Sequence, residues 1–402
     1  METAAGSPQE IRQTFCALSD IKVIEFSHVV MGPVCGQILG HLGADVIKVE
    51  PPPEGETARR LKGQGGGYFT FYNTNKRSLM IDLKSSEGKA VCYRLIDQAD
   101  VVIENYAPGT LEKLGFGYEA IQIRNPRIIF CSLKGFLEGP YQNRLGLDEM
   151  IEMMSGLAFM NGLPGKPMRV GASVLDVLGG VFGVVGILTA LREREVSGKG
   201  KRVEVGLFET AAYLMGQHMA QAALQKSALV PMSVRTSAWG VYDLFKSKDG
   251  EDVFIGITSD SQWMRFCQAF DFQELLANGQ LKSNEERISA RSWLLPILQA
   301  KLSTLSLASI LQLCEQAGIA FAPVLSPEAL FTDPHMQFGS LLPTCLPGGE
   351  MALLPNLPIT LDGAKSTIRL QPPAPGEHNH EIIEQERQDW IRSALQTVED
   401  RC

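Results

Sequence analysis

The sequence predicts an α/β protein with a large domain built on a mainly parallel sheet and a smaller α+β domain. Three observations lead to this class. Short β-branched runs alternate with helical patterns along the first third of the chain. The composition shifts near residues 227–239, and a hairpin pattern follows at 240–258. With 402 residues the chain is also long enough for two or three domains.

The alternation begins at residues 21–26, where IKVIEF has the length and β-branched content of a buried strand. A helical spacing of apolar residues follows in SHVVMGPVCGQILGHLGA, and DVIKVE at 45–50 again has the pattern of a strand. The later elements are strands over 78–83, 100–105 and 127–133 and a helix over 86–99. Strands that alternate with helices in this way form a parallel sheet with helices on both faces.

We divide the chain into residues 1–225 (large domain), 226–325 (small domain) and 326–402 (C-terminal segment). In the small domain, GVYDLFKSKDGEDVFIGIT predicts two strands joined at a KDG turn, and helices follow to about residue 318. The C-terminal segment is rich in proline and ends in an amphipathic helical pattern within PPAPGEHNHEIIEQERQDWI.

The composition argues against several functional classes. A net charge of -8 and a pI near 5.4 disfavour general binding of nucleic acid or anionic membranes, although a local basic pocket can still bind one anion. The eight cysteines are scattered without a CxxC pair, which indicates neither a disulfide framework nor a metal site. The glycines after the first strand do not form GxGxxG, which argues against a nicotinamide cofactor.

The sequence indicates a cytoplasmic protein. Its start, METAAGSPQEIRQ, lacks the basic and then apolar pattern of a secretion signal. The most apolar segment, VLGGVFGVVGILTAL at 177–191, is broken by glycines and is shorter than the roughly 20 residues that a spanning helix needs. We therefore expect a buried helix there and no membrane partner.

Several phrases of the sequence resemble one family, in the order in which that family has them. They lie between about residues 20 and 385 and are GADVIKVE, NTNKRS, VVIENYAPGTLEKLGFGYE, NPRIIFCSLKGF, SGKGKRVEV, GIAFAPVLSPEALFTDPH and PGEHNHEI. The chain resembles the class III CoA transferases, which include formyl-CoA:oxalate and carnitine CoA transferases and the α-methylacyl-CoA racemases. The resemblance implies a Rossmann-like large domain formed by both chain ends, a small domain from the middle, and a homodimer of interlocked chains.

A binding site for coenzyme A is expected from the residues as well. CoA carries several negative charges, which an acidic protein binds through local cations and backbone donors. Three lysines lie near the ends of predicted strands, where ligands of open α/β sheets bind, although a surface lysine taken alone is usually just solvated. The resemblance implies CoA contacts at Lys84, Asn105, Tyr106, Lys113, Lys134 and Phe136. We expect acyl-CoA as a substrate and no metal.

Exchange of CoA between two acids requires a protein carboxylate as nucleophile. In the formyl-CoA transferase branch, the resemblance assigns it to the loop that matches NGLPGKPM at 161–168, which has no carboxylate here. The candidates are Asp148 in GLDEMIEMMSGL and Asp176 in VLDVLGG, because both match positions beside the thioester in the racemase branch. We expect Asp148 to be the nucleophile. The alternative for each is a helix N-cap.

The chain also departs from the formyl-CoA transferase branch at Val30 and Pro51, where that branch has glutamine and arginine. Two other functions stay open. A racemase or isomerase needs a base on each face of the substrate carbon, and Asp260 loosely matches the second acid, but Leu147 replaces the histidine of the racemases. The loop without a carboxylate also allows a catalytically silent subunit of a heteromeric transferase.

The carboxylic acid substrate is not determined by the sequence. Dicarboxylates such as succinate are candidates, because arginine pairs with a carboxylate through two parallel hydrogen bonds. The available arginines are Arg144, Arg169 and Arg235.

Overall fold

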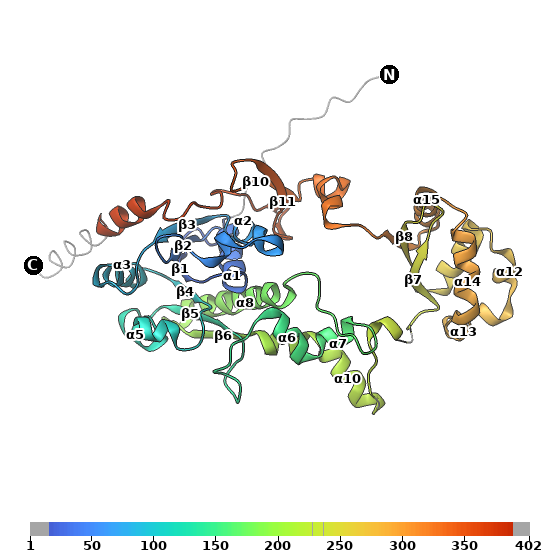
Figure 1. The fold of residues 1–402 in the computed structure, drawn as a ribbon, viewed down its shortest axis with the longest axis horizontal. Helices are drawn as coiled ribbons and strands as arrows, with labels where there is room; N and C mark the ends of the chain where they lie inside the picture. Colours follow the sequence, from blue (N-terminus) through green and yellow to red (C-terminus); the bar gives the residue numbers. More distant parts are fainter. Residues whose placement is uncertain (1–15, 227, 236, 389–402) are drawn as a thin grey trace, which may run out of the picture. The chain divides into compact units, whose positions relative to one another are not determined.

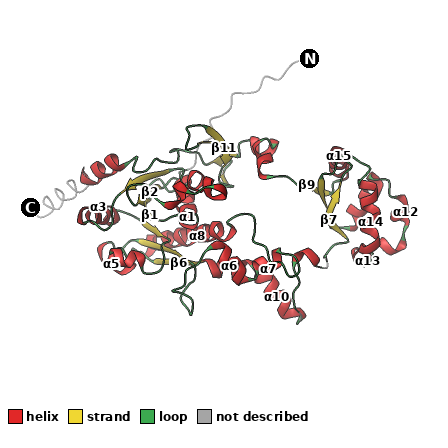
Figure 2. Cartoon of the chain, in the orientation of Figure 1, coloured by secondary structure: helices red, strands yellow, loops and turns green. Residues whose placement is uncertain are grey.

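The computed structural model describes residues 16–226, 228–235 and 237–388 (Figures 1 and 2). The chain forms two compact units, of which unit 2 comprises Val234–Asp333 and unit 1 comprises the residues on either side of it. The domain limits expected at 226 and 325 each lie a few residues before these bounds.

Unit 1 is built on a six-stranded sheet in which every pair of neighbouring strands is parallel. The strands, in spatial order, are β3 (Lys76–Met80), β2 (Asp45–Glu50), β1 (Lys22–Phe26), β4 (Val101–Glu104), β5 (Ile129–Lys134) and β6 (Arg202–Gly206). This is the arrangement of the Rossmann fold, so the predicted α/β class with a mainly parallel sheet is confirmed. The third strand begins and ends slightly earlier than the sequence pattern 78–83 predicted.

Helices cover both faces of this sheet (Figure 1). Successive side chains of a strand point to opposite faces, and on β1 Val23 belongs to one core while Ile24 and Phe26 belong to the other. The first core is closed by α1 (Met31–His41) and α8 (Val174–Ser197), and the second by α3 (Ser86–Asp97) and α5 (Tyr118–Arg124).

Helix α8 has 24 residues and is longer than the apolar segment 177–191 suggested. It packs against α1, β5 and β6, and its glycines allow the close approach. A Cβ atom at Gly180 would lie 2.8 Å from the backbone oxygen of Met31. By length and composition α8 would suffice to cross a membrane, with 39% of its apolar window buried in this chain. A core helix of a compact protein has the same properties.

Shorter elements complete unit 1. The helices are α2 (Tyr68–Tyr72), α4 (Thr110–Leu114), α6 (Asp148–Ser155), α7 (Leu157–Asn161), α9 (Leu207–Leu214), α10 (Gly216–Gln225) and α16 (Pro334–Gln337). Two small antiparallel hairpins, which the sequence pattern did not predict, are β10–β11 (Leu341–Cys345, Met351–Pro355) and β12–β13 (Thr360–Leu361, Ala364–Lys365).

The C-terminal segment lies along the outer edge of β3. The backbone N–H of Asn75 donates to Leu370 O at 2.8 Å, and His378 N donates to Ser78 O at 3.2 Å. Further along, Asn379 both accepts from Met80 N and donates to Met80 O. Residues 379–388 are helical, and the rest of the expected amphipathic helix lies outside the described residues, as does the start METAAGSPQEIRQ. The segment thus provides hydrogen-bond partners for the backbone of β3, the edge strand of the sheet.

Unit 2 is a three-stranded antiparallel sheet covered by helices. Strands β7 (Val241–Lys246) and β8 (Asp252–Ile257) form the predicted hairpin, with Gly250 at φ +81° in its turn, and β9 (Ala320–Pro323) pairs with β8. The helices are α11 (Asp260–Ala269), α12 (Gln273–Ala277), α13 (Asn284–Ser289), α14 (Arg291–Leu302) and α15 (Leu307–Ala317).

Candidate active site

The site begins where the strand order of the sheet reverses, between β1 and β4. In open α/β sheets ligands bind at such a point, outside the carboxyl ends of the strands. The loop after β1 carries His28, and the loop after β4 carries Asn105 and Tyr106. The His28 and Tyr106 rings stack with centroids 5.6 Å apart. Asn105 fixes this pair, because its side chain accepts from His28 N at 2.9 Å and donates to His28 O at 3.0 Å.

Two cavities meet at the stacked rings, since His28 and Tyr106 line both of them. The first, of about 360 Å³, contains Arg60 and Lys84, and we call it the cation cavity. The second, of about 260 Å³, contains Asp148 and Asp176, and we call it the carboxylate cavity. Burial lowers the pKa of His28, and Lys48 and Lys134 lower it further against the effect of Glu56, so the shared wall is neutral at pH 7.

The cation cavity lies at the carboxyl ends of β2 and β3. Lys84 is exposed there, and Arg60 is held by Glu54 through an ion pair of 3.2 Å and a hydrogen bond of 3.0 Å to its backbone oxygen. Sequence reasoning did not single out Arg60. The only local signal was its position in the connection after the second strand, where Arg59 and Arg60 stand side by side.

The other expected CoA contacts lie in different surroundings. Asn105, Tyr106 and Lys134 line the carboxylate cavity. Lys134 already has partners in this chain, because its Nζ lies 2.6 Å from Glu104 Oε2 and 2.7 Å from Tyr106 O. Lys113 is exposed on α4 outside both sets of lining residues. Phe136 is buried in the first core, where it packs on Tyr141 and Phe208.

Asp148 is a helix cap, but not of its own helix. It is the first residue of α6, and its Oδ2 accepts from the backbone N–H groups of Leu175 (2.9 Å) and Asp176 (3.0 Å) at the start of α8. Its Oδ1 is buried and has no hydrogen-bond partner within the described chain. The N-cap alternative therefore applies to α8, and it leaves one oxygen of Asp148 beside the cavity.

Asp176 lies in the first turn of α8 and also lines the carboxylate cavity. Burial, and then the charge of Asp148, raise the pKa of Asp176 to about 7. Within the described chain no hydrogen bond to its carboxylate oxygens is found. The two carboxylates also act on Tyr72 of α2, whose pKa is raised to about 12 by burial first and by the charges of Tyr68, Asp176 and Asp148.

Glu152, one helical turn after Asp148 on α6, lies behind the pair and was not identified from the sequence. It is completely buried, and its Oε2 accepts from Val170 N at 2.7 Å. Burial raises the pKa of Glu152, and the nearby Asp148 raises it further, against the effects of the Val170 amide and Arg169. We call Asp148, Glu152 and Asp176 the acidic group.

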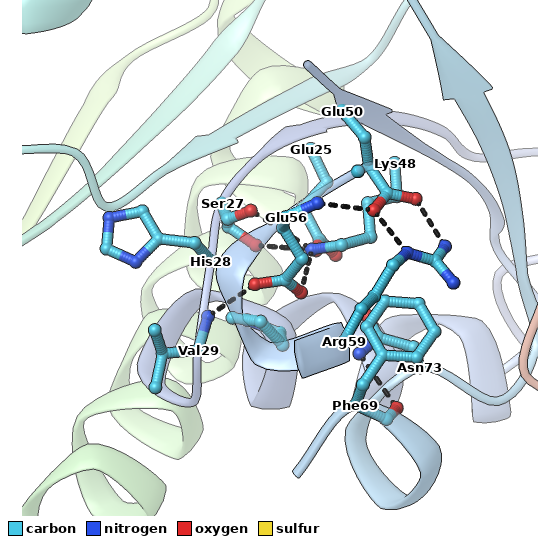
Figure 3. A network of polar contacts seen from close by, with 12 residues as sticks. Glu25, Ser27, His28, Val29, Lys48, Glu50, Glu56, Arg59, Phe69 and Asn73 are labelled. Carbon is cyan, nitrogen blue, oxygen red and sulfur yellow. Dashed lines mark hydrogen bonds and ion pairs between the residues drawn. The ribbon is translucent and has the colours of Figure 1, made fainter. Parts of the chain in front are cut away.

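A second set of buried charges lies beside the loop after β1 (Figure 3). Lys48 Nζ lies 3.1 Å from Glu25 Oε1 and 3.0 Å from Glu56 Oε1, and Lys76 Nζ lies 2.8 Å from Glu25 Oε2. We call Glu25, Lys48, Glu56 and Lys76 the ion-pair cluster. Burial opposes the charge of Glu25, but Lys76 and Lys48 outweigh it and lower the pKa of Glu25.

Several expected candidates lie elsewhere. The loop 161–168 closes on itself between Leu163 and Lys166 and provides no lining residue of the carboxylate cavity. Asp260 belongs to unit 2 and forms an ion pair with Arg287. Of the three arginines, Arg144 lines the carboxylate cavity, whereas Arg169 pairs with Glu149 at 3.3 Å and Arg235 lies in unit 2.

Comparison with known proteins agrees with this arrangement over almost the whole chain. Residues 18–379 match the model of the CoA-transferase family III. The chain is 32% identical to an acyl-CoA transferase of Fusarium pseudograminearum, over 92% of this chain and 84% of the relative. It is 30% identical to the succinyl-CoA–L-malate CoA-transferase beta subunit of Chloroflexus aurantiacus, over 92% and 94%. A CAIB/BAIF family protein from Brucella suis superposes with a TM-score of 0.82 at 28% identity, over 93% of this chain and all of that one. The chain therefore belongs to the CoA-transferase family III and is an enzyme of that class.

Proposed function

We propose that this enzyme moves CoA from an acyl-CoA donor such as succinyl-CoA to a second carboxylic acid, and that Asp176 is its nucleophile. The main supporting observation is that two cavities meet at one pair of stacked rings. One contains Arg60 and the exposed Lys84, and the other contains Asp176, whose pKa is raised. The charged phosphates of CoA suit Arg60 and Lys84, and the thioester end then lies toward Asp176.

The choice of Asp176 revises our expectation that Asp148 attacks. Oδ2 of Asp148 already accepts two backbone hydrogen bonds, which fix the residue and lower its reactivity. Asp176 keeps both oxygens available, and a carboxylate of higher pKa is a better nucleophile once it is deprotonated. Asp148 then holds the start of α8 and sets the pKa of Asp176.

The exchange follows from this assignment. An oxygen of Asp176 attacks the thioester carbonyl, the C–S bond breaks, and CoA leaves as a thiolate from a mixed anhydride. The thiolate attacks the aspartyl carbonyl, which releases the first acid and leaves an aspartyl-CoA thioester. The second acid attacks this thioester, the C–S bond breaks, and CoA leaves again as a thiolate from a second mixed anhydride. The thiolate then attacks the acyl carbonyl of the second acid, which forms the new acyl-CoA and frees the Asp176 carboxylate.

Arg144 is our candidate for recognising a second carboxylate on the acid. It lines the carboxylate cavity, and its guanidinium lies 4.8 Å from the ring of Tyr141, which orients it. A dicarboxylate such as succinate or malate fits this chemistry, in keeping with the relative that acts on succinyl-CoA and L-malate.

We further propose that the active form is a homodimer in the cytoplasm. Helix α8 has apolar side chains exposed at one helical spacing, including Val181 and Val185, and α10 exposes Met219 and Leu224. Such surface is normally covered in an assembly. The related beta subunit makes a heteromer the alternative. A folded 44 kDa species that stays monomeric at micromolar concentration would rule out the homodimer and leave the heteromer.

The function is tested by incubating the purified chain with acyl-CoA donors and free acids and measuring new acyl-CoA products by mass spectrometry. Hydroxylamine added during turnover converts the aspartyl thioester to a hydroxamate, and peptide mapping locates it. We expect it on Asp176. A hydroxamate on Asp148 would restore our first expectation, and no exchange with any pair would favour a silent subunit.

A further inference from the structure

The loop between β1 and α1 contains a strained residue. Val29 has φ +66°, although its side chain is β-branched. Residues other than glycine seldom adopt this region, and a β-branched residue there is an outlier that persists only when the surroundings enforce it. Val29 lines the carboxylate cavity directly after His28, so the strain lies in the wall of the proposed site.

One side chain supplies the enforcing contact. Oε2 of Glu56 accepts a hydrogen bond from Val29 N at 2.8 Å, and its Oε1 pairs with Lys48 at 3.0 Å (Figure 3). Lys48 in turn donates to Ser27 O at 3.0 Å, so both contacts act on the same loop. Glu56, Lys48 and Ser27 are buried and Val29 is partly buried, which strengthens the interactions.

Glu56 itself is fixed at its backbone. Its N–H donates to Glu50 Oε2 at 3.0 Å, and Glu50 is paired with Arg59 through bonds of 2.7 and 2.6 Å. Arg59 also lies 3.6 Å over the ring of Phe69. The carboxylate of Glu56 is therefore presented to the loop from a rigid support that belongs to the wall of the cation cavity.

We propose that Glu56 is a positioning residue for acyl-CoA: it holds Val29 in the strained conformation and so keeps His28 against Tyr106 between the two cavities. This inference rests on the proposed function, because the ligand that crosses between the cavities is the acyl-CoA. If Val29 relaxes to negative φ, the peptide carrying His28 rotates, and the shared wall of the two cavities changes shape.

A purely structural role for Glu56 makes a different prediction. Lys48 needs carboxylates to stay buried as a cation, and Glu25 and Glu56 would both serve that purpose. Glu25 provides the matched control, because it contacts Lys48 and Lys76 but not Val29. Glycine at position 29 discriminates between the two roles, since it adopts positive φ without strain.

The test is a double-mutant cycle with CoA affinity measured by calorimetry. Glu56→Gln has one acceptor oxygen for two donors, and when that oxygen turns to the Lys48 cation, the amide NH2 group faces Val29 N and cannot hold it. This change should weaken CoA binding by about tenfold, the cost of one strained residue. In the Val29→Gly background the same change should weaken it by no more than about twofold, because there is little strain left to hold. Glu25→Gln is the control: adding Val29→Gly should not reduce any loss of CoA affinity that Glu25→Gln causes.

The outcomes separate the two proposals. If the wild-type chain does not bind CoA, the proposed function fails. If the wild type binds and the losses from Glu56→Gln and Val29→Gly are simply additive, the positioning role is overturned while the function stands. If Glu56→Gln does not fold, Glu56→Asp replaces it, because it keeps the charge for Lys48 but is one methylene shorter. If Val29→Gly restores folding to the Glu56 variant, the positioning role is supported. If the Glu56 variant fails to fold in both the wild-type and the Val29→Gly backgrounds, the positioning role is overturned.

Discussion

Two groups of buried carboxylates lie in unit 1, and their surroundings differ. In the ion-pair cluster, Lys48 and Lys76 lie within 3.1 Å of Glu25. In the acidic group, Asp148 and Glu152 each keep a buried oxygen without a hydrogen-bond partner in the described chain. The pKa of Glu25 is lowered, whereas those of Glu152 and Asp176 are raised. Nearby cations thus favour the charged form of a buried carboxylate, and burial without such cations favours its protonated form.

The largest effect should come from the acidic group. Asp176→Asn should reduce acyl exchange by at least about a thousandfold, because the nucleophile is lost. CoA affinity should change little, since the cation cavity is untouched. Exchange is measured with the acyl-CoA pair found for the wild type. If the variant retains exchange while Asp148→Asn does not, the roles of the two aspartates are reversed.

In the ion-pair cluster the effect should be on folding. Lys76→Met removes a cation 2.8 Å from Glu25 and leaves that buried carboxylate with Lys48 alone, which should cost about 3 kcal/mol of unfolding free energy. Denaturant unfolding measures this. The matched control is Arg192→Met, which breaks an exposed ion pair with Glu195 and should cause no measurable change. Equal stability of both variants would contradict the distinction.

The loss of a lysine without a partner in the described chain and the loss of a lysine in an ion pair should also differ in their effects on CoA affinity and stability. Lys84→Ala should weaken CoA binding by about tenfold without altering stability, because Lys84 is exposed in the cation cavity. Lys134→Ala should also lower stability, because it leaves the buried Glu104 without its cation. Lys113→Ala, outside both cavities, is the control. Calorimetry and unfolding on the three variants decide the matter, and an unchanged affinity in Lys84→Ala would refute the cation cavity as the phosphate site.

The pH dependence of exchange should reveal the coupling between the two aspartates. Asp176 must be deprotonated to attack, so the wild-type rate should fall as the pH drops through about 7. In Asp148→Asn the nearby negative charge is gone, the pKa of Asp176 falls, and the loss should move to lower pH. Burial keeps that pKa above the ordinary value, so the shift is partial. Identical midpoints in rate profiles from pH 5 to 8 would disprove the coupling.

The smallest effect should be a gain in stability. The folded pKa of Asp176 is raised from 3.8 to about 7, so its ionisation destabilises the folded state as the pH rises between these values. A shift of this size corresponds to about 4 kcal/mol, but Asp176 is only partly buried and solvent reduces the cost. Asp176→Asn removes the remaining cost and should stabilise the protein by about 1 kcal/mol at pH 8, with little gain at pH 4. The start of α8 favours a carboxylate and offsets part of the cost. A variant less stable than the wild type at pH 8 would show that the offset dominates.

The sheet could be predicted from local sequence because each strand buries a contiguous β-branched run. Strands β1, β2 and β4 were located to within one residue at either end. The hairpins β10–β11 and β12–β13 were missed, since the sequences LLPTC and MALLP show no alternation of apolar and polar residues, and β12 and β13 have two residues each. The length of α8 was underestimated because its last turns are polar and were not part of the apolar segment.

The site was predicted in part for a similar reason. The aspartates, Asn105 and Tyr106 follow strands or precede an apolar helix, which are patterns that local sequence contains. The roles of the two aspartates depend on a contact between α6 and α8 whose partners lie 28 residues apart in the sequence. No local pattern encodes this contact. Arg60 and Glu56 come from an irregular connection, where position relative to the sheet is set only by tertiary packing.

The contact of the C-terminal segment with β3 has a consequence for synthesis. Ser78 and His378 exchange hydrogen bonds across 300 residues of sequence. A ribosome releases β3 long before the residues that cover it, so the nascent chain presents an open sheet edge until translation is nearly complete. Open edges pair with other chains. The residues from Leu370 onward therefore protect a strand that is synthesised much earlier, and a chain truncated before Leu370 should be prone to aggregate.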